Sequence, residues 1–177
     1  DGEQAKPSFH GYFLERLDGF ERRRGPSGPQ RRTANREYLA FKEFYDWLPG
    51  RENVGELGAG TCTGPIAYKN IEVLESDLAN IKDAIDQRQC SDVFYPSIAP
   101  TYVAATRGNE YYKTFEEYEQ AMADAMAVEF KAIVAAGSVV QIDDPRIISY
   151  YTNMPDKSIA ECRRWAEHHV EVLNYAL

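Results

Sequence analysis

The chain has 177 residues and a formal net charge of −8, with 28 acidic and 20 basic side chains. Its length and its 44% hydrophobic content are those of one soluble domain with a sizeable core, and the acidic balance argues against nucleic-acid partners, because phosphate binding needs a basic face. No stretch approaches the roughly 20 apolar residues of a membrane helix, and no signal-peptide layout opens the chain, so we expect a cytoplasmic protein without a membrane partner.

The first quarter of the chain is predicted to be a helix, a loop and an ambiguous segment. Apolar residues recur at spacings of three and four over residues 7–20, which predicts a helix. Residues 21–37 are rich in Arg, Gly and Pro and are interpreted as a loop insertion. Its arginines are most simply solvated, and a site for a phosphate or polyacidic group is the alternative. Residues 38–48 are apolar and aromatic and fit either a helix or an extended segment.

The middle of the chain indicates two strand-to-helix or strand-to-loop units. A small-residue run ending in Thr63-Gly64-Pro65 is interpreted as a buried strand that leads into a functional loop. An apolar face over residues 72–86 then predicts a helix. Residues 90–100 form a short apolar run broken by prolines, which favours a strand followed by a loop, and residues 101–112 continue that loop.

Two capping boxes mark the later helices. The first, Thr114-Phe-Glu-Glu117, opens a long helix with an apolar stripe that stops at Gly137. The second, Ser158-Ile-Ala-Glu161, opens the last helix. Between them, residues 138–143 form a β-branched run that predicts a strand.

The alternation of strands and helices predicts an α/β fold with a parallel sheet and covering helices. The pattern alone fits a closed barrel or an open doubly wound sheet. Neither a G-x-G-x-x-G nor a G-x-x-x-x-G-K phosphate loop occurs in the sequence, which argues against nucleotide binding. Residues 1–177 are expected to form one domain, and the first and last residues suggest a piece of a longer protein.

Two acids are the main candidates for a functional site. Glu3 precedes a predicted helix, and Asp143 ends a predicted strand. Strand carboxyl ends of a parallel β/α fold open on one face, so both acids are expected at that face. There they can hold an ammonium group, act in acid/base chemistry or bind a metal. The alternative is that Glu3 is solvated and that Asp143 or Asp144 caps a turn; Asp144, which precedes Pro145, is assigned to structure.

The remaining candidates are weaker. Two histidines in the last helix, His168 and His169, are expected to be surface or packing residues, and Cys162 on the same helix is expected to be buried and inert. Cys62 lies next to the T-G-P loop, but no histidine partner is visible for nucleophilic catalysis. The three cysteines are expected to be reduced, and they form no zinc motif. Surface positions are favoured over substrate contacts for Lys69, Arg107, Tyr111 and Tyr112.

Four stretches carry a resemblance to a known family: DGEQ with GYFLERLDGF, TCTGPIAYKN, the helix before AAGSVVQIDDP, and AECRRWAEHHVEVLNYAL. Together they resemble the catalytic barrel of cobalamin-independent methionine synthases. The resemblance covers nearly the whole chain except the Arg-rich loop. It implies an eight-stranded β/α (TIM) barrel, here partial, without its first strand and its C-terminal strands.

The resemblance also implies a function. The family makes methionine as a zinc-dependent 5-methyltetrahydropteroyltriglutamate-homocysteine S-methyltransferase, in which zinc binds the homocysteine thiolate that attacks the methyl group. Glu3 and Asp143 match the acids that contact the amino-acid part of homocysteine. The zinc ligands are expected beyond Leu177, so this chain is expected to be inactive by itself. No cobalamin is expected.

Two departures from full methionine synthases keep alternatives open. IAYKNIEV stands where a folate-stacking Trp follows T-G-P, and RIISYY lacks an acid that follows Q-I-D-[DE]-P in the family. Alkyl transfer to coenzyme M by the same zinc-thiolate chemistry is therefore an alternative to homocysteine methylation by a folate donor. A non-catalytic barrel fragment is the alternative from another class.

Overall fold

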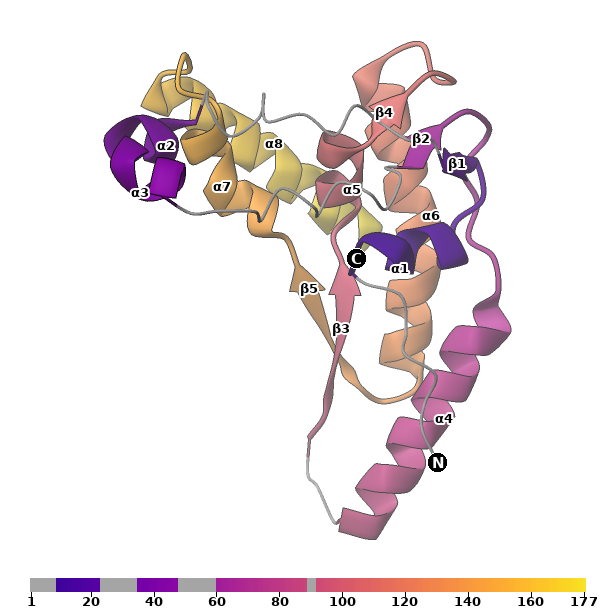
Figure 1. The fold of residues 1–177 in the computed structure, drawn as a ribbon. Helices are drawn as coiled ribbons and strands as arrows, with labels where there is room; N and C mark the ends of the chain where they lie inside the picture. Colours follow the sequence, from indigo (N-terminus) through magenta and orange to yellow (C-terminus); the bar gives the residue numbers. More distant parts are fainter. Residues whose placement is uncertain (1–8, 23–34, 48–59, 89–91) are drawn as a thin grey trace.

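A computed structural model describes residues 9–22, 35–47, 60–88 and 92–177, which form a mixed α/β fold (Figure 1). The elements are α1 (Phe9–Arg16), β1 (Phe20–Arg22), α2 (Arg36–Ala40), α3 (Lys42–Trp47), β2 (Gly60–Cys62), α4 (Ile71–Arg88), β3 (Phe94–Ile98), α5 (Pro100–Thr106), β4 (Gly108–Asn109), α6 (Phe115–Ala135), β5 (Val139–Asp143), α7 (Pro145–Asn153) and α8 (Ile159–Ala176). None of the helices in these ranges has the length and apolar character that crossing a bilayer requires.

The strands form two small sheets. In the first, β2 pairs with β1 in antiparallel fashion and with β4 in parallel fashion. In the second, β3 and β5 are parallel, with a register that runs from Phe94 opposite Val139 to Ile98 opposite Asp143. The expected alternation of strands and helices is present, but the strands of the described ranges do not close into a barrel.

The long helix α6 is the centre of the packing. Its start satisfies both halves of the expected capping box: Thr114 Oγ1 accepts from the Glu117 N–H at 3.1 Å, and Glu117 Oε2 accepts from the Thr114 N–H at 3.4 Å. The predicted stop at Gly137, which has φ +83°, is confirmed. The buried stripe of α6 joins side chains of α1, β3 and α5 in the main core, which includes Phe13, Leu17, Ile98, Val103, Tyr118, Met122, Met126 and Phe130.

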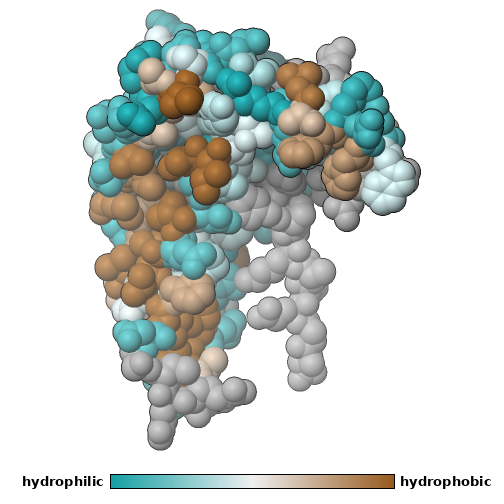
Figure 2. Space-filling view, turned by 90° about the vertical axis from the view of Figure 1, so that its left-hand side faces the viewer, coloured by the Kyte–Doolittle hydropathy of each residue, from teal (hydrophilic) through white to brown (hydrophobic). Residues whose placement is uncertain are grey.

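The two faces of the β3–β5 pair have different surroundings, because side chains alternate across a sheet. Tyr95 packs with side chains of α4 and α6 on the covered face. On the other face, Phe94 and Val139 are 62% and 61% exposed. Figure 2 shows hydrophobic residues gathered in a column down one side of the molecule. Asp143 lies four residues after Val139 and therefore belongs to the open face of the strand pair.

The structure corrects two expectations and decides a third. The expectation of a loop at residues 101–112 is wrong at its start, because α5 occupies Pro100–Thr106, with proline at the first helical position and Val103 buried in the core. A second helix, α7, lies where the sequence indicates only a turn. Residues 38–48 adopt the helical alternative as far as the description extends, in α2 and α3. Most of the predicted loop at residues 21–37 lies outside the described residues.

We expect Gly19 to be a position that tolerates no side chain. Its φ is +87°, and a Cβ atom there would lie 2.7 Å from the Pro65 carbonyl oxygen. Gly137 is a matched control, because its φ is +83° but a Cβ atom added there would have no neighbour within 4 Å. Gly137→Ala should therefore cost only the left-handed backbone penalty of about 1–2 kcal/mol, and Gly19→Ala about 1–3 kcal/mol more from the clash. Equal losses in urea unfolding, followed by circular dichroism, would contradict the close approach.

Candidate functional site

The carboxyl ends of β3 and β5 lie side by side and form the candidate site. Because the two strands are parallel, the chain leaves the sheet at the same edge after each of them (Figure 1). Ala99 N donates a hydrogen bond to the Asp143 carbonyl oxygen at 3.1 Å, which ties the two exits together. The helices α5 and α7 then begin at Pro100 and Pro145. In parallel β/α folds this edge is where functional side chains are presented.

Asp143 is the exposed acid of this edge. It is the last residue of β5 and lies on the open face of the strand pair. Within the part of the chain that the structure describes, its carboxylate has no hydrogen-bond or ion-pair partner. A solvent-facing carboxylate without an internal partner can accept an ammonium group or another cation without first breaking an existing contact. The predicted role of Asp143 in substrate binding stays a prediction.

Asp144 has a different role, although it follows directly in the sequence. Its Oδ1 accepts from the Arg146 N–H at 3.0 Å and so caps α7, while its Oδ2 accepts from the Thr101 hydroxyl at 2.7 Å. The second contact joins the first turn of α5 to the start of α7. The interpretation of Asp144 as a structural residue is confirmed.

The other predicted acid, Glu3, lies outside the described residues. The convergence of Glu3 and Asp143 on one site therefore stays a prediction. The structure describes only the Asp143 side of this predicted site. There, an exposed carboxylate ends β5 and is flanked by the starts of α5 and α7.

A buried carboxylate below this edge was not anticipated from the sequence. Glu129 of α6 is completely buried and accepts hydrogen bonds from Tyr12 at 2.5 Å, Tyr68 at 2.5 Å and Ser97 at 2.6 Å. Arg16 lies 3.6 Å away and forms an ion pair with it. Ser97 lies one residue before the end of β3, so this network fixes the strand from its covered side.

The same network keeps its tyrosines protonated. Burial, followed by the negative charge of Glu129, raises the pKa of Tyr12 and the pKa of Tyr68 well above their ordinary value. Both hydroxyls therefore remain hydrogen-bond donors at any ordinary pH. A sequence signal for Glu129 existed, because it lies three residues after Met126 in the apolar stripe of α6, where an acid needs buried partners.

Cys62 is not an activated thiol in this structure. It is completely buried, its Sγ donates to the Gly64 carbonyl oxygen at 3.3 Å, and burial raises its pKa. Burial therefore opposes thiolate formation. The T-G-P loop beside it is anchored by a hydrogen bond from the Ile66 N–H to the Tyr112 hydroxyl at 2.9 Å. Tyr112 thus holds the loop rather than lying free at the surface.

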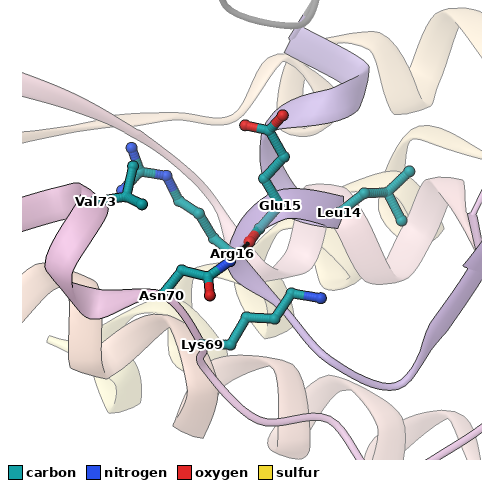
Figure 3. Close-up of a pocket in the computed structure, with 6 residues that line it drawn as sticks. All are labelled: Leu14, Glu15, Arg16, Lys69, Asn70 and Val73. Atoms are coloured by element: carbon teal, nitrogen blue, oxygen red, sulfur yellow. Dashed lines mark hydrogen bonds between the residues drawn. The ribbon is translucent and has the colours of Figure 1, made fainter.

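A hollow of about 320 Å³ lies between α1 and the start of α4, away from the ends of β3 and β5. Its lining consists of Leu14, Glu15, Arg16, Lys69, Asn70 and Val73 (Figure 3). Arg16 and Lys69 extend in opposite directions in this view. Each is paired with an acid, Arg16 with Asp77 at 3.0 Å and Lys69 with Asp18 at 2.9 Å. The hollow is therefore poorly suited to bind an anion.

Most of the remaining candidates have the roles that the sequence favours, but Arg107, for which a surface position is expected, is half-buried. Arg107 stacks over the Phe13 ring at 5.0 Å, and Tyr111 is 50% exposed. Cys162 is buried, as expected. The packing role expected for His169 is confirmed, whereas His168 contacts an acid from another helix, Glu119, at 2.7 Å. That partner lies 49 positions earlier and is not visible in the spacing of the last helix.

The Glu129 network should contribute strongly to stability. We expect Glu129→Gln to lower the free energy of unfolding by about 3 kcal/mol or more, because the neutral amide loses the ion pair and turns a donor group toward hydroxyl donors. Urea unfolding measures this loss. Asp83→Asn, which neutralises an exposed acid in the middle of α4, is the control and should leave stability nearly unchanged. A Glu129→Gln protein as stable as the wild type would show that the network is dispensable.

Comparisons with known proteins agree with this fold. No protein-family model and no curated protein sequence matches the chain. Among solved structures, a B12-independent methionine synthase from Shewanella sp. W3-18-1, in complex with selenomethionine, is similar with a TM-score of 0.52 at 18% sequence identity. The similarity covers 89% of this chain and 39% of that chain, so this chain spans less than half the length of that enzyme. The described residues therefore share a mixed α/β fold with part of a methionine synthase.

Proposed function

We propose that this chain is part of the catalytic domain of a zinc-dependent thiol methyltransferase that makes methionine from homocysteine without cobalamin. In this proposal Asp143 binds the α-ammonium group of the amino acid, together with Glu3. Homocysteine and a folate methyl donor are the small-molecule substrates. The complete fold is a β/α barrel, of which this chain supplies a part.

One observation carries the proposal: an exposed carboxylate, Asp143, which has no partner among the described residues, ends a parallel strand in a chain that shares its fold with part of a methionine synthase. The solved neighbour holds selenomethionine, an amino acid with an ammonium group. An ammonium group that leaves water needs negative charge nearby, and a carboxylate provides it. The site chemistry and the fold likeness therefore support the same ligand class.

Asp143 also bears on the choice of thiol. Homocysteine carries an ammonium group, which a carboxylate attracts. Coenzyme M carries a sulfonate instead, and a carboxylate next to it would repel that group. Asp143 therefore favours an amino-acid thiol over the coenzyme M alternative. The identity of the methyl donor does not follow from Asp143, because in the proposal this residue contacts only the amino-acid substrate.

The zinc ion of the proposal depends on other residues. Across the described ranges, no group of three His, Cys, Asp or Glu side chains lies close enough to hold a metal ion. Both described cysteines, Cys62 and Cys162, are buried and do not fit such a role. The ligands of the proposed zinc ion are therefore residues other than these. When bound, zinc would supply a thiolate nucleophile at neutral pH.

The proposal predicts that Asp143 binds the ammonium group of the ligand. In the protein expressed from its complete gene, we expect Asp143→Asn to weaken methionine binding about 30-fold or more, the effect of removing one partner of a desolvated charge pair. Isothermal titration calorimetry measures this change. Asp83→Asn, which neutralises an exposed acid of α4, is the control and should bind like the wild type.

A ligand-side comparison makes the test specific. The analogue of methionine that lacks its amino group should bind the wild type and Asp143→Asn equally, because the interacting charge is then absent from both complexes. Methionine binding that is unchanged in Asp143→Asn would contradict the assigned role. A complete protein that contains no zinc and binds neither methionine nor homocysteine would favour the non-catalytic alternative.

A further inference from the structure

A second buried acid lies on α6, at its contact with α8. Glu119 is 1% exposed and faces two histidines of α8. Its Oε2 lies 2.7 Å from His168 Nε2, and its Oε1 lies 3.6 Å from His169 Nε2. The His168 side chain is 45% exposed, whereas His169 is fully buried. Glu119 and His169 are therefore buried, and His168, which contacts Glu119, is the member of the cluster that is exposed to solvent.

The geometry fixes the tautomer of His169. Its Nδ1 lies 3.1 Å from the Trp165 carbonyl oxygen, and the Trp165 ring lies against the imidazole with centroids 3.5 Å apart. A carbonyl oxygen only accepts hydrogen bonds, so Nδ1 must carry the hydrogen. In the neutral ring, Nε2 is then a lone-pair acceptor that faces Glu119.

If Glu119 were ionised, its Oε1 acceptor would therefore face the Nε2 acceptor of His169. In the described part of the chain, neither Glu119 Oε1 nor His169 Nε2 has a hydrogen-bond partner. Two buried acceptors that face each other without a donor are costly. One proton between them converts the repulsion into attraction. Their separation of 3.6 Å is only a few tenths of an ångström beyond hydrogen-bond range, which a small side-chain rotation closes.

The protonation tendencies of the two groups assign the proton to the acid. Burial is the largest influence on Glu119 and raises its pKa above the ordinary 4.5. Burial also lowers the pKa of His169 from 6.5 to about 4, and the charges of His168 and Arg146 act in the same direction. A neutral acid that donates to a neutral imidazole avoids placing two ions in the core.

We propose that the folded chain holds one proton between Glu119 Oε1 and His169 Nε2, that Glu119 is thereby a neutral carboxylic acid, and that loss of this proton loosens α8 from α6. Besides α6, α8 packs against α5 and α7, the two helices that begin at the candidate site. The proton site thus makes the packing behind that edge sensitive to pH. This inference does not rest on the proposed function.

The surroundings of the pair contain few other charges. The titratable and charged groups that face it are Glu116 on α6, Arg146 on α7 and His168 on α8. The third neighbouring helix, α5, has the sequence PTYVAAT and contributes no acidic or basic residue, only one tyrosine. Burial raises the pKa of Glu119, the hydrogen bond and charge of His168 act against that rise, and the negative charge of Glu116 adds to it. The positive charge of Arg146 helps to keep His169 neutral.

The sign of the pH dependence follows from the two shifts. The raised pKa of Glu119 contributes stability that is fully present below 4.5 and is lost as pH rises through the folded-state value. The lowered pKa of His169 contributes stability that is present above 6.5 and is lost as pH falls toward about 4. Below 6.5, and from 4.5 up to the raised pKa of Glu119, the pair holds one proton in either state, so its contribution is flat. As pH rises through that raised pKa, the folded pair releases its proton and the contribution of Glu119 is lost.

Glu119→Gln tests this assignment. The glutamine amide can donate to His169 and accept from His168 as the neutral acid does, but it cannot ionise. The His169 contribution is common to both proteins and cancels in their ratio. From about pH 5 upward, we expect the unfolding equilibrium constant of the wild type to rise about tenfold per pH unit relative to that of Glu119→Gln, until the raised pKa of Glu119 is passed. Urea unfolding at each pH measures the ratio.

Several outcomes overturn the proposal. A ratio that does not change with pH would mean that Glu119 is ionised in the fold. Asp83→Asn, which removes an exposed carboxylate of α4 that is not among the groups facing the pair, should keep the wild-type pH dependence, and a change equal to that of Glu119→Gln would point to general surface charge. Hydrogen exchange should show that the amides of α8 lose protection at alkaline pH in the wild type but not in Glu119→Gln. Equal protection in the two proteins would contradict the proposal that loss of the proton loosens α8.

A measurement on the wild type alone covers the case in which the variant does not fold. Nitrogen-15 spectra of the histidine rings, recorded at about pH 6, should show His169 as a neutral ring protonated at Nδ1. Titration toward acid should leave it neutral until about pH 4. An imidazolium at His169 near pH 6 would place the proton on the wrong partner and overturn the assignment.

Discussion

One buried carboxylate, that of Glu129, holds together segments that lie far apart in the sequence. Its donors come from α1, from the stretch after the T-G-P loop and from β3, and Tyr12 is 117 positions away. A carboxylate at this depth is tolerable only when several donors replace the water that it loses. Because α6 carries Glu129 through the middle of the core, the placement of β3, and with it the edge where β3 and β5 end, depends on this one group.

The two buried acids of α6 have different sets of hydrogen-bond partners. Glu129 is surrounded by three hydroxyl donors and Arg16, so it remains an acceptor. Glu119 has one donor, His168, and otherwise faces the lone pair of His169, so it is better satisfied as a neutral acid. The same residue type on one helix face thus serves once as a permanent anchor and once as a proton-dependent contact. The difference lies entirely in the groups that neighbouring helices bring to each position.

At the end of β5, the adjacent acids Asp143 and Asp144 have different roles because their side chains point in different directions. Asp143 is still part of β5 and follows its alternation onto the open face, whereas Asp144 has left the strand and turns back to cap α7 and bond Thr101. The capping contact ties down the start of α7, and next to it lies the exposed carboxylate of Asp143, which has no partner among the described residues. The proposed role of Asp143 in ligand binding rests on the exposure of this carboxylate at the end of β5.

What the sequence by itself determined was local. The two capping boxes, the glycine stop at Gly137, the strand before Asp143 and the structural role of Asp144 depend on neighbours within a few residues, and all of them are present as predicted. The acids of the α6 stripe could have been noticed from their helical phase, but not their partners. Tertiary structure alone decided that α5 forms, how the strands pair, and which groups surround Glu119 and Glu129, because these depend on contacts that are brought together only when the chain folds.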